Sequence, residues 1–80
     1  MQSVCKSCQI QGSETIAGTD LTFEECKSRC VKNDNCHGID FGKGTKKGIC
    51  WLQTEQNTIT SHQDSFDAWK KTSHCGTLVL

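Results

Sequence analysis

The sequence predicts a small α+β domain in which one α-helix packs on an antiparallel β-sheet. Three observations support this class: a capped helical segment at 22–32, several short alternating segments that read as strands, and seven cysteines among 80 residues. A chain of this length buries a smaller share of its surface than a larger domain does, so its core alone is a weak source of stability. We therefore expect disulfides to hold the fold, as they do in short secreted chains of this cysteine content.

The helix is the most clearly predicted element. Thr22 is suited to the N-cap and Glu25 to the third helical position, which together form a capping box. Leu21 and Cys26 occupy the two positions of a hydrophobic staple. Acidic residues begin the segment and basic residues follow, as the helix dipole favours. The pattern predicts a helix from Phe23 to about Lys32, before a turn rich in asparagine.

The strands are predicted from alternation of apolar and polar residues. A polar, glycine-rich segment at 42–48 is expected to form a hairpin loop between two of them. In the strand before this loop, His37, Ile39 and Phe41 are expected on one face. The expected strand regions are 9–19 with its turns, 36–41, 49–52, 58–60 and 66–69.

The cysteine spacing favours bridges between the helix and its neighbours. Cys26 and Cys30 are four residues apart, so they project from one helix face. This geometry lets Cys30 reach Cys36 just beyond the turn. It also lets Cys26 reach a cysteine on an adjacent strand, and Cys50 fits that position. Because seven is odd, at least one cysteine is free, pairs with another chain, or pairs with a further segment.

The block from 22 to 52 carries a more specific pattern, Thr22-x2-Glu25-Cys26-x3-Cys30-x5-Cys36-x-Gly38-Ile39-x-Phe41 followed by Cys50-Trp51-Leu52. This pattern resembles the PAN/apple domain family of extracellular modules. The resemblance extends over most of the chain and implies one domain at 1–80, with its core at about 8–75. It also implies the family fold, a helix held against a curved antiparallel sheet.

The resemblance implies three disulfides, two between helix and sheet and a third between the chain ends. The implied pairs are Cys26 with Cys50, Cys30 with Cys36, and Cys75 with Cys8 or Cys5. We prefer Cys8 as the partner of Cys75, because Cys8 directly precedes the first expected strand. Cys5 is then expected to be unpaired or to link two chains as a disulfide-bonded dimer.

Two other uses of cysteine fit the pattern less well. Zinc would need Cys26, Cys30, Cys36 and His37, but these residues do not form two close ligand pairs, and adjacent strand residues point to opposite faces. A redox role for the Cys5-x-x-Cys8 motif would require a helix N-terminus within a βαβ unit, whereas this motif lies near the chain terminus. We therefore expect no metal site.

Composition and motifs argue against several functions. Nine basic and nine acidic residues cancel, so no strong field attracts nucleic acid or an anionic membrane, and no apolar run is long enough for a bilayer span. The histidines at 37, 62 and 74 are scattered and accompany no nucleophile motif. We expect a protein that is not an enzyme and needs no cofactor.

The candidate binding residues are three lysines of the glycine-rich loop and one tryptophan: Lys43, Lys46, Lys47 and Trp51. The lysines form either a solvated hairpin tip, which Lys70 and Lys71 can extend, or a site for an anionic partner such as a sulfated glycan. Trp51 either packs on the sheet or offers a face for stacking.

These observations together predict a non-enzymatic recognition or adhesion module that binds protein or carbohydrate. We expect it to be secreted or to be the extracellular part of a larger protein. The alternatives are a free-standing secreted effector, such as an inhibitor or a toxin-like ligand, and a reduced zinc-binding module.

Overall fold

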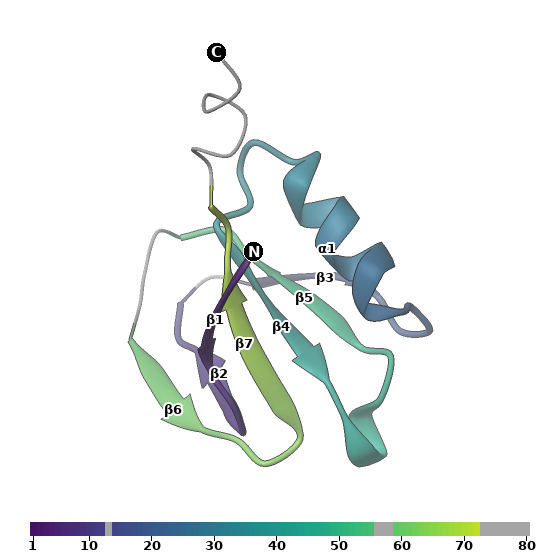
Figure 1. Ribbon diagram of the computed structural model, residues 1–80, viewed down its shortest axis with the longest axis vertical. Helices are drawn as coiled ribbons and strands as arrows, with labels where there is room; N and C mark the ends of the chain where they lie inside the picture. The colour runs from purple at the N-terminus through teal and green to yellow at the C-terminus, as the bar shows by residue number, and fades with distance from the viewer. Residues whose placement is uncertain (13, 56–58, 73–80) are drawn as a thin grey trace.

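The computed structural model describes residues 1–12, 14–55 and 59–72, which form an α+β fold (Figure 1). One α-helix, α1 (Phe23–Val31), packs against an antiparallel sheet. The strands are β1 (Gln2–Cys5), β2 (Cys8–Ile10), β3 (Glu14–Gly18), β4 (Gly38–Gly42), β5 (Cys50–Gln53), β6 (Thr60–His62) and β7 (Phe66–Lys70). A short 3-10 helix, η1 (Gly44–Lys46), lies in the turn between β4 and β5.

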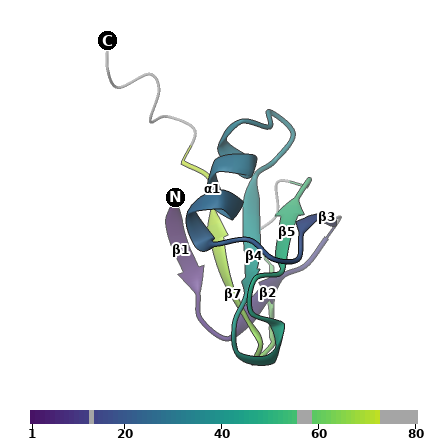
Figure 2. The same ribbon diagram turned by 90° about the vertical axis from the view of Figure 1, so that its right-hand side faces the viewer.

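The strands form two sheets, and every strand pair is antiparallel. Five strands make the main sheet in the order β1-β7-β4-β5-β3, while β2 and β6 form a two-stranded ribbon. Helix α1 lies in front of the upper part of the main sheet in Figure 2. The ribbon packs through β2 against β4 and β7. The described residues therefore form three layers: helix, main sheet and ribbon.

Helix α1 begins as its sequence predicts. The Glu25 amide donates to Thr22 Oγ1 at 3.1 Å, and the Thr22 amide donates to Glu25 Oε1 at 2.8 Å, which completes the capping box. These hydrogen bonds with Thr22 lower the pKa of the exposed Glu25 carboxyl. Leu21 packs against the cluster that contains Cys26, as the staple requires. The predicted helix, from Phe23 to about Lys32, is confirmed.

Cysteines form most of the buried cluster between helix and sheet. Ile39 and Leu52 from the two central strands are buried there beside four buried cysteines, namely Cys26, Cys30, Cys36 and Cys50. The aromatic ring of Phe23 meets Phe41 edge-on at 5.7 Å between centroids and lies 4.8 Å from the ring centroid of Trp69. A smaller cluster of Cys8, Ile10 and Ala68 fills the space between the main sheet and the ribbon.

Two predicted disulfides are present. Cys26 bonds Cys50 with their Cα atoms 5.6 Å apart, and Cys30 bonds Cys36 with a Cα separation of 5.2 Å. The first connects α1 to β5, and the second connects the last turn of α1 to the segment that leads into β4. As disulfides, these sulfurs cannot act as thiolate ligands of zinc.

The third disulfide differs from the prediction and corrects it. Cys5 bonds Cys8 rather than remaining unpaired, so neither is available to Cys75 or to a second chain in this structure. Ser7 takes a positive φ of 53°, and this turn leaves the Cα atoms of Cys5 and Cys8 6.0 Å apart. Cys75 lies outside the described residues. Two cysteines three residues apart can bond when the chain reverses between two strands, and their spacing alone does not indicate that reversal.

The predicted strand at 9–19 is also corrected, because the chain forms two strands there. Gly12 has a φ of 127°, which a residue with a side chain rarely adopts, and the chain changes direction between Ile10 and Glu14. Strand β2 joins the ribbon and β3 joins the main sheet. Strands at 36–41, 49–52 and 66–69 are confirmed within two residues, β1 was not predicted, and the strand expected at 58–60 lies partly outside the described residues.

The Cys5–Cys8 bond can be tested by peptide mapping, because trypsin cleaves after Lys6, between the two cysteines. We expect residues 1–6 to stay attached to residues 7–27 until a reductant is added, and then to separate. Mass spectrometry of the digest with and without reductant provides the measurement. Release of residues 1–6 from the unreduced protein, with Cys8 joined to the peptide that holds Cys75, would contradict the bond.

Candidate functional site

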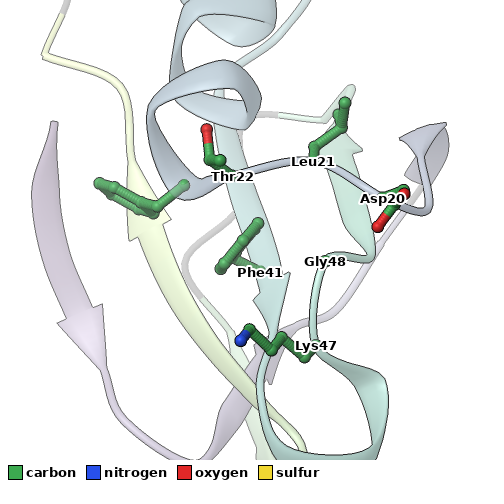
Figure 3. Close-up of a pocket in the computed structure, with 7 residues that line it drawn as sticks. Asp20, Leu21, Thr22, Phe41, Lys47 and Gly48 are labelled. Carbon is green, nitrogen blue, oxygen red and sulfur yellow. The ribbon is translucent and has the colours of Figure 1, made fainter.

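The described part of the structure contains a pocket of about 570 Å³ beside the start of α1 (Figure 3). Its walls come from two places in the chain: the segment that enters α1, and the turn between β4 and β5 with the end of β4. The lining residues are Asp20, Leu21, Thr22, Phe23, Phe41, Lys47 and Gly48. Its volume lies in the range of small-molecule sites, roughly 300–1,000 Å³.

Local backbone contacts hold the two walls together. The Leu21 amide donates to the Gly48 carbonyl at 3.0 Å. Gly48 has a φ of 89°, and a Cβ atom there would lie 3.0 Å from the Thr19 carbonyl oxygen. Only glycine meets both conditions without strain. The sequence signal for this contact is the last glycine of the loop, which we had read only as part of a hairpin.

The pocket combines an apolar interior with a few charged groups. Phe41 and Phe23 supply aromatic surface, and their mutual edge-on contact fixes the orientation of both rings. Asp20 and Lys47 supply opposite charges on exposed side chains. In Figure 3 the Lys47 side chain lies below Phe41, and Asp20 lies at the right, beyond Leu21. Such a mixture suits a ligand with one apolar face and several polar groups.

The three predicted lysines do not act together. Lys43 Nζ lies 2.8 Å from Asp67 Oδ1 and also donates to Ser7 Oγ at 3.0 Å. Lys43 is thus occupied by intramolecular contacts, which connect the turn after β4 to β7 and to the β1–β2 turn. Lys46 and Lys47 are exposed, and Lys47 lines the pocket. Lys71, considered as an extension of the cluster, donates instead to the Asn33 carbonyl at 3.1 Å.

Trp51 lies away from the pocket. Its strand neighbours Cys50 and Leu52 are buried on the helix side of the sheet, so Trp51 projects from the opposite face. It is half-buried there and pairs across the sheet with Ile16 and Asp40. The structure therefore separates Trp51 from the lysines with which we grouped it as a candidate.

A second polar cluster, which sequence reasoning missed, lies between the main sheet and the ribbon. The Ile10 amide donates to Asp40 Oδ1 at 3.0 Å, and Gln53 Nε2 donates to the Ile10 carbonyl. Gln53 Nε2 also donates to Glu14 Oε1 at 3.0 Å. Side chains of the main sheet thus make hydrogen bonds with the backbone groups on the buried edge of β2. The alternation of side chains along β4 places Asp40 on the sheet face opposite to that of Ile39 and Phe41. No feature of the local sequence indicated that a ribbon covers this face.

The described residues show no cluster of side chains suited to metal binding. Residues 1–12, 14–55 and 59–72 contain no group of three or more His, Cys, Asp and Glu side chains arranged to hold a metal ion. His62 bonds Asp64 at the surface, and His37 lies just before β4. Within the same ranges, no helix has the length and apolar character needed to cross a bilayer.

Comparison with known proteins gives no match: no family model, curated protein or solved structure is similar to this chain at a significant level.

The Lys43–Asp67 pair makes a prediction for acid stability. Partial burial raises the pKa of Asp67, but hydrogen bonds from Lys43 and from the Ser7 amide outweigh it, so the pKa lies below its ordinary value of 3.8. A carboxyl group whose pKa is lower in the folded state than in the unfolded state stabilises the folded protein at pH values above the unfolded pKa. This stabilisation is lost as the pH falls through the folded-state pKa. We expect Asp67→Asn to lower the unfolding free energy at pH 7 by about 1 kcal/mol, given partial exposure.

The difference between Asp67→Asn and the native protein should shrink below pH 4, as measured by thermal unfolding across the pH range. Asp64→Asn is the matched control, because its side chain is 84% exposed and bonds only His62 among the described residues. A pH-independent difference for Asp67→Asn would show that the Lys43 pair does not contribute in this way.

Proposed function

We propose that this chain is a PAN/apple-like, non-enzymatic recognition module that is secreted or forms the extracellular part of a larger protein. The support is the pattern at 22–52 together with a helix on an antiparallel sheet and the disulfides Cys26–Cys50 and Cys30–Cys36. These are features that the resemblance implies. Disulfides persist in oxidising, extracellular compartments, which agrees with the proposed location.

The proposed function is binding to a protein or carbohydrate ligand in the pocket beside α1. The single observation that carries this proposal is the pocket lined by Phe41, Phe23 and Lys47. Aromatic surface can stack on the apolar face of a sugar ring or cover a partner's side chain. The Lys47 ammonium then offers a donor to a hydroxyl, carboxylate or sulfate group.

The disulfide framework supports recognition rather than chemistry. The Cys26–Cys50 disulfide joins the first turns of α1 to the start of β5, next to the two walls of the pocket, and so restricts these walls before any ligand arrives. A pre-organised site loses little conformational entropy on binding. Asp20 lines the pocket together with Lys47, so its carboxylate offsets the lysine charge and the ligand is expected to be only weakly anionic. This differs from the expectation that Lys43, Lys46 and Lys47 together form a site for an anionic partner such as a sulfated glycan.

The two exposed lysines of the turn provide a matched test. Lys47 lines the pocket, whereas its neighbour Lys46 does not. We expect Lys47→Ala to weaken binding roughly fivefold, the equivalent of about 1 kcal/mol for one lost charge-assisted hydrogen bond, and Lys46→Ala to change it by less than about twofold. A glycan array that includes neutral, carboxylated and sulfated members, followed by titration of the ligands found, measures both variants.

Equal losses in the two variants would mean that the turn attracts ligands by charge alone and that the pocket is not the site. An unchanged affinity for Lys47→Ala would also contradict the pocket. Binding of neutral sugars that survives Lys47→Ala but is lost in Phe41→Leu would retain the pocket and assign recognition to the aromatic surface.

A further inference from the structure

Asp40 is the most deeply buried acidic residue in the described part of the chain. Its side chain is 0% exposed, on the face of β4 that the ribbon covers, and Gln53 beside it is 1% exposed. An ionised carboxylate in such a position loses the hydration of its charge and needs strong partners in return. The groups that surround Asp40 show whether it has them.

The hydrogen bonds around Asp40 lack one donor. The Ile10 amide donates to Asp40 Oδ1, and Gln53 Nε2 is used by the Ile10 carbonyl and by Glu14. Among the residues that the structure describes, Asp40 Oδ2 and Gln53 Oε1 have no hydrogen-bond partner. Both atoms are acceptors when Asp40 is ionised, so neither can satisfy the other. One proton on a carboxyl group would supply the missing donor.

Within the described ranges, no positive charge faces Asp40 to replace that proton. Strand β3 contributes Glu14, which is itself acidic and raises the pKa of Asp40. The residues paired with Asp40 on β5 and β7 are Trp51 and Ala68, and β2 contributes Ile10. Lys70 lies two residues beyond Ala68 on β7 and is exposed. The titratable neighbour of Asp40 is therefore a like charge, which disfavours ionisation of Asp40.

We infer that Asp40 holds a proton in the folded protein, and that this proton makes attachment of the β2–β6 ribbon to the main sheet sensitive to pH. The inference rests on the buried cluster and is independent of the pocket beside α1. The ribbon depends on this cluster because side chains of Asp40 and Gln53, rather than another strand, bind the Ile10 backbone.

Burial is the main cause of a raised pKa for Asp40, to about 8, and the neighbouring Glu14 adds to it. The ordinary value for the unfolded chain is 3.8. The folded state therefore binds a proton that the unfolded state releases between these two values. Stability from this group is fully present below the unfolded pKa and is lost as the pH rises through the folded pKa. The direction is opposite to that of Asp67.

The direct test is a pH titration of the Asp40 carboxyl carbon by NMR in the ¹³C-labelled native protein. We expect a midpoint far above the ordinary aspartate range, and a clear downward shift of that midpoint in Glu14→Gln. Urea unfolding across the same pH range gives a second measurement. The unfolding equilibrium constant should rise by up to about tenfold for each pH unit between about pH 5 and pH 7.5, because one proton separates the two states.

Two variants separate Asp40 from other acidic groups. Asp40→Asn keeps an acceptor for Ile10 and adds an amide donor, so we expect it to flatten the pH dependence and to be at least as stable as the native protein at pH 8. Asp34→Asn, at an exposed turn residue, is the control and should keep the native slope. If Asp40→Asn does not fold, the carbon titration of the native protein still decides the question.

Two results would overturn the inference. An Asp40 midpoint in the ordinary range, with stability independent of pH, would mean that the carboxylate is ionised and hydrated. Calcium chloride at millimolar concentration tests a cation in place of the proton. A shift of the Asp40 carbon signal and a rise in stability at pH 8 with calcium, absent in Asp40→Asn, would assign the cluster to a cation.

Discussion

The Cys26–Cys50 disulfide is the constraint on which the rest of this fold depends. It joins α1 to β5 through two residues that are both 0% exposed, and Cys30–Cys36 fixes the other end of the helix. Five of the ten buried apolar residues in the described ranges are cysteines. Few large aliphatic side chains share the helix–sheet interface with them. A nine-residue helix has little stability of its own, so its position comes from these bonds and from the cap.

The pocket follows from the same constraint. Because Cys26 is one turn into α1, its bond to β5 also fixes the start of the helix and the residues that precede it. Thr22 and Leu21 are then held against the turn at Gly48, and Phe23 meets Phe41. The arrangement positions aromatic and charged side chains from distant parts of the sequence without a large core.

The parts of the fold that local chemistry determines could be predicted from the sequence. The capping box at Thr22 and Glu25 fixes the start of α1, and the four-residue spacing of Cys26 and Cys30 fixes their common face. The parts that were missed depend on long-range pairing. Strand β1 has no distinctive alternation and forms because β7 offers it an edge. The Cys5–Cys8 bond depends on a turn at Ser7 whose stability comes from Asp67 and Lys43, sixty and thirty-six residues away.

In the candidate sites, too, some features follow from the local sequence and others depend on contacts between distant segments. The sequence indicated that the lysine-rich turn is exposed, but it could not show that Asp67 neutralises Lys43 while Lys47 lines a pocket. The burial of Asp40 could not be predicted either, because it depends on a ribbon formed by β2 and β6, whose sequences are fifty residues apart. Polar residues in such positions are recognised only when both layers of the fold are known.

The most direct test of this account compares the unfolding free energies of two double variants under urea. The chain-entropy model assigns about 3.5 kcal/mol to the loop closed by Cys26 and Cys50 and about 2 kcal/mol to the one closed by Cys5 and Cys8. We expect Cys26→Ala/Cys50→Ala to lose clearly more stability than Cys5→Ala/Cys8→Ala, with additional loss from the buried cavity, and to lose the Phe23–Phe41 contact. Equal losses, with the helix position unchanged, would contradict the central role of the Cys26–Cys50 bond.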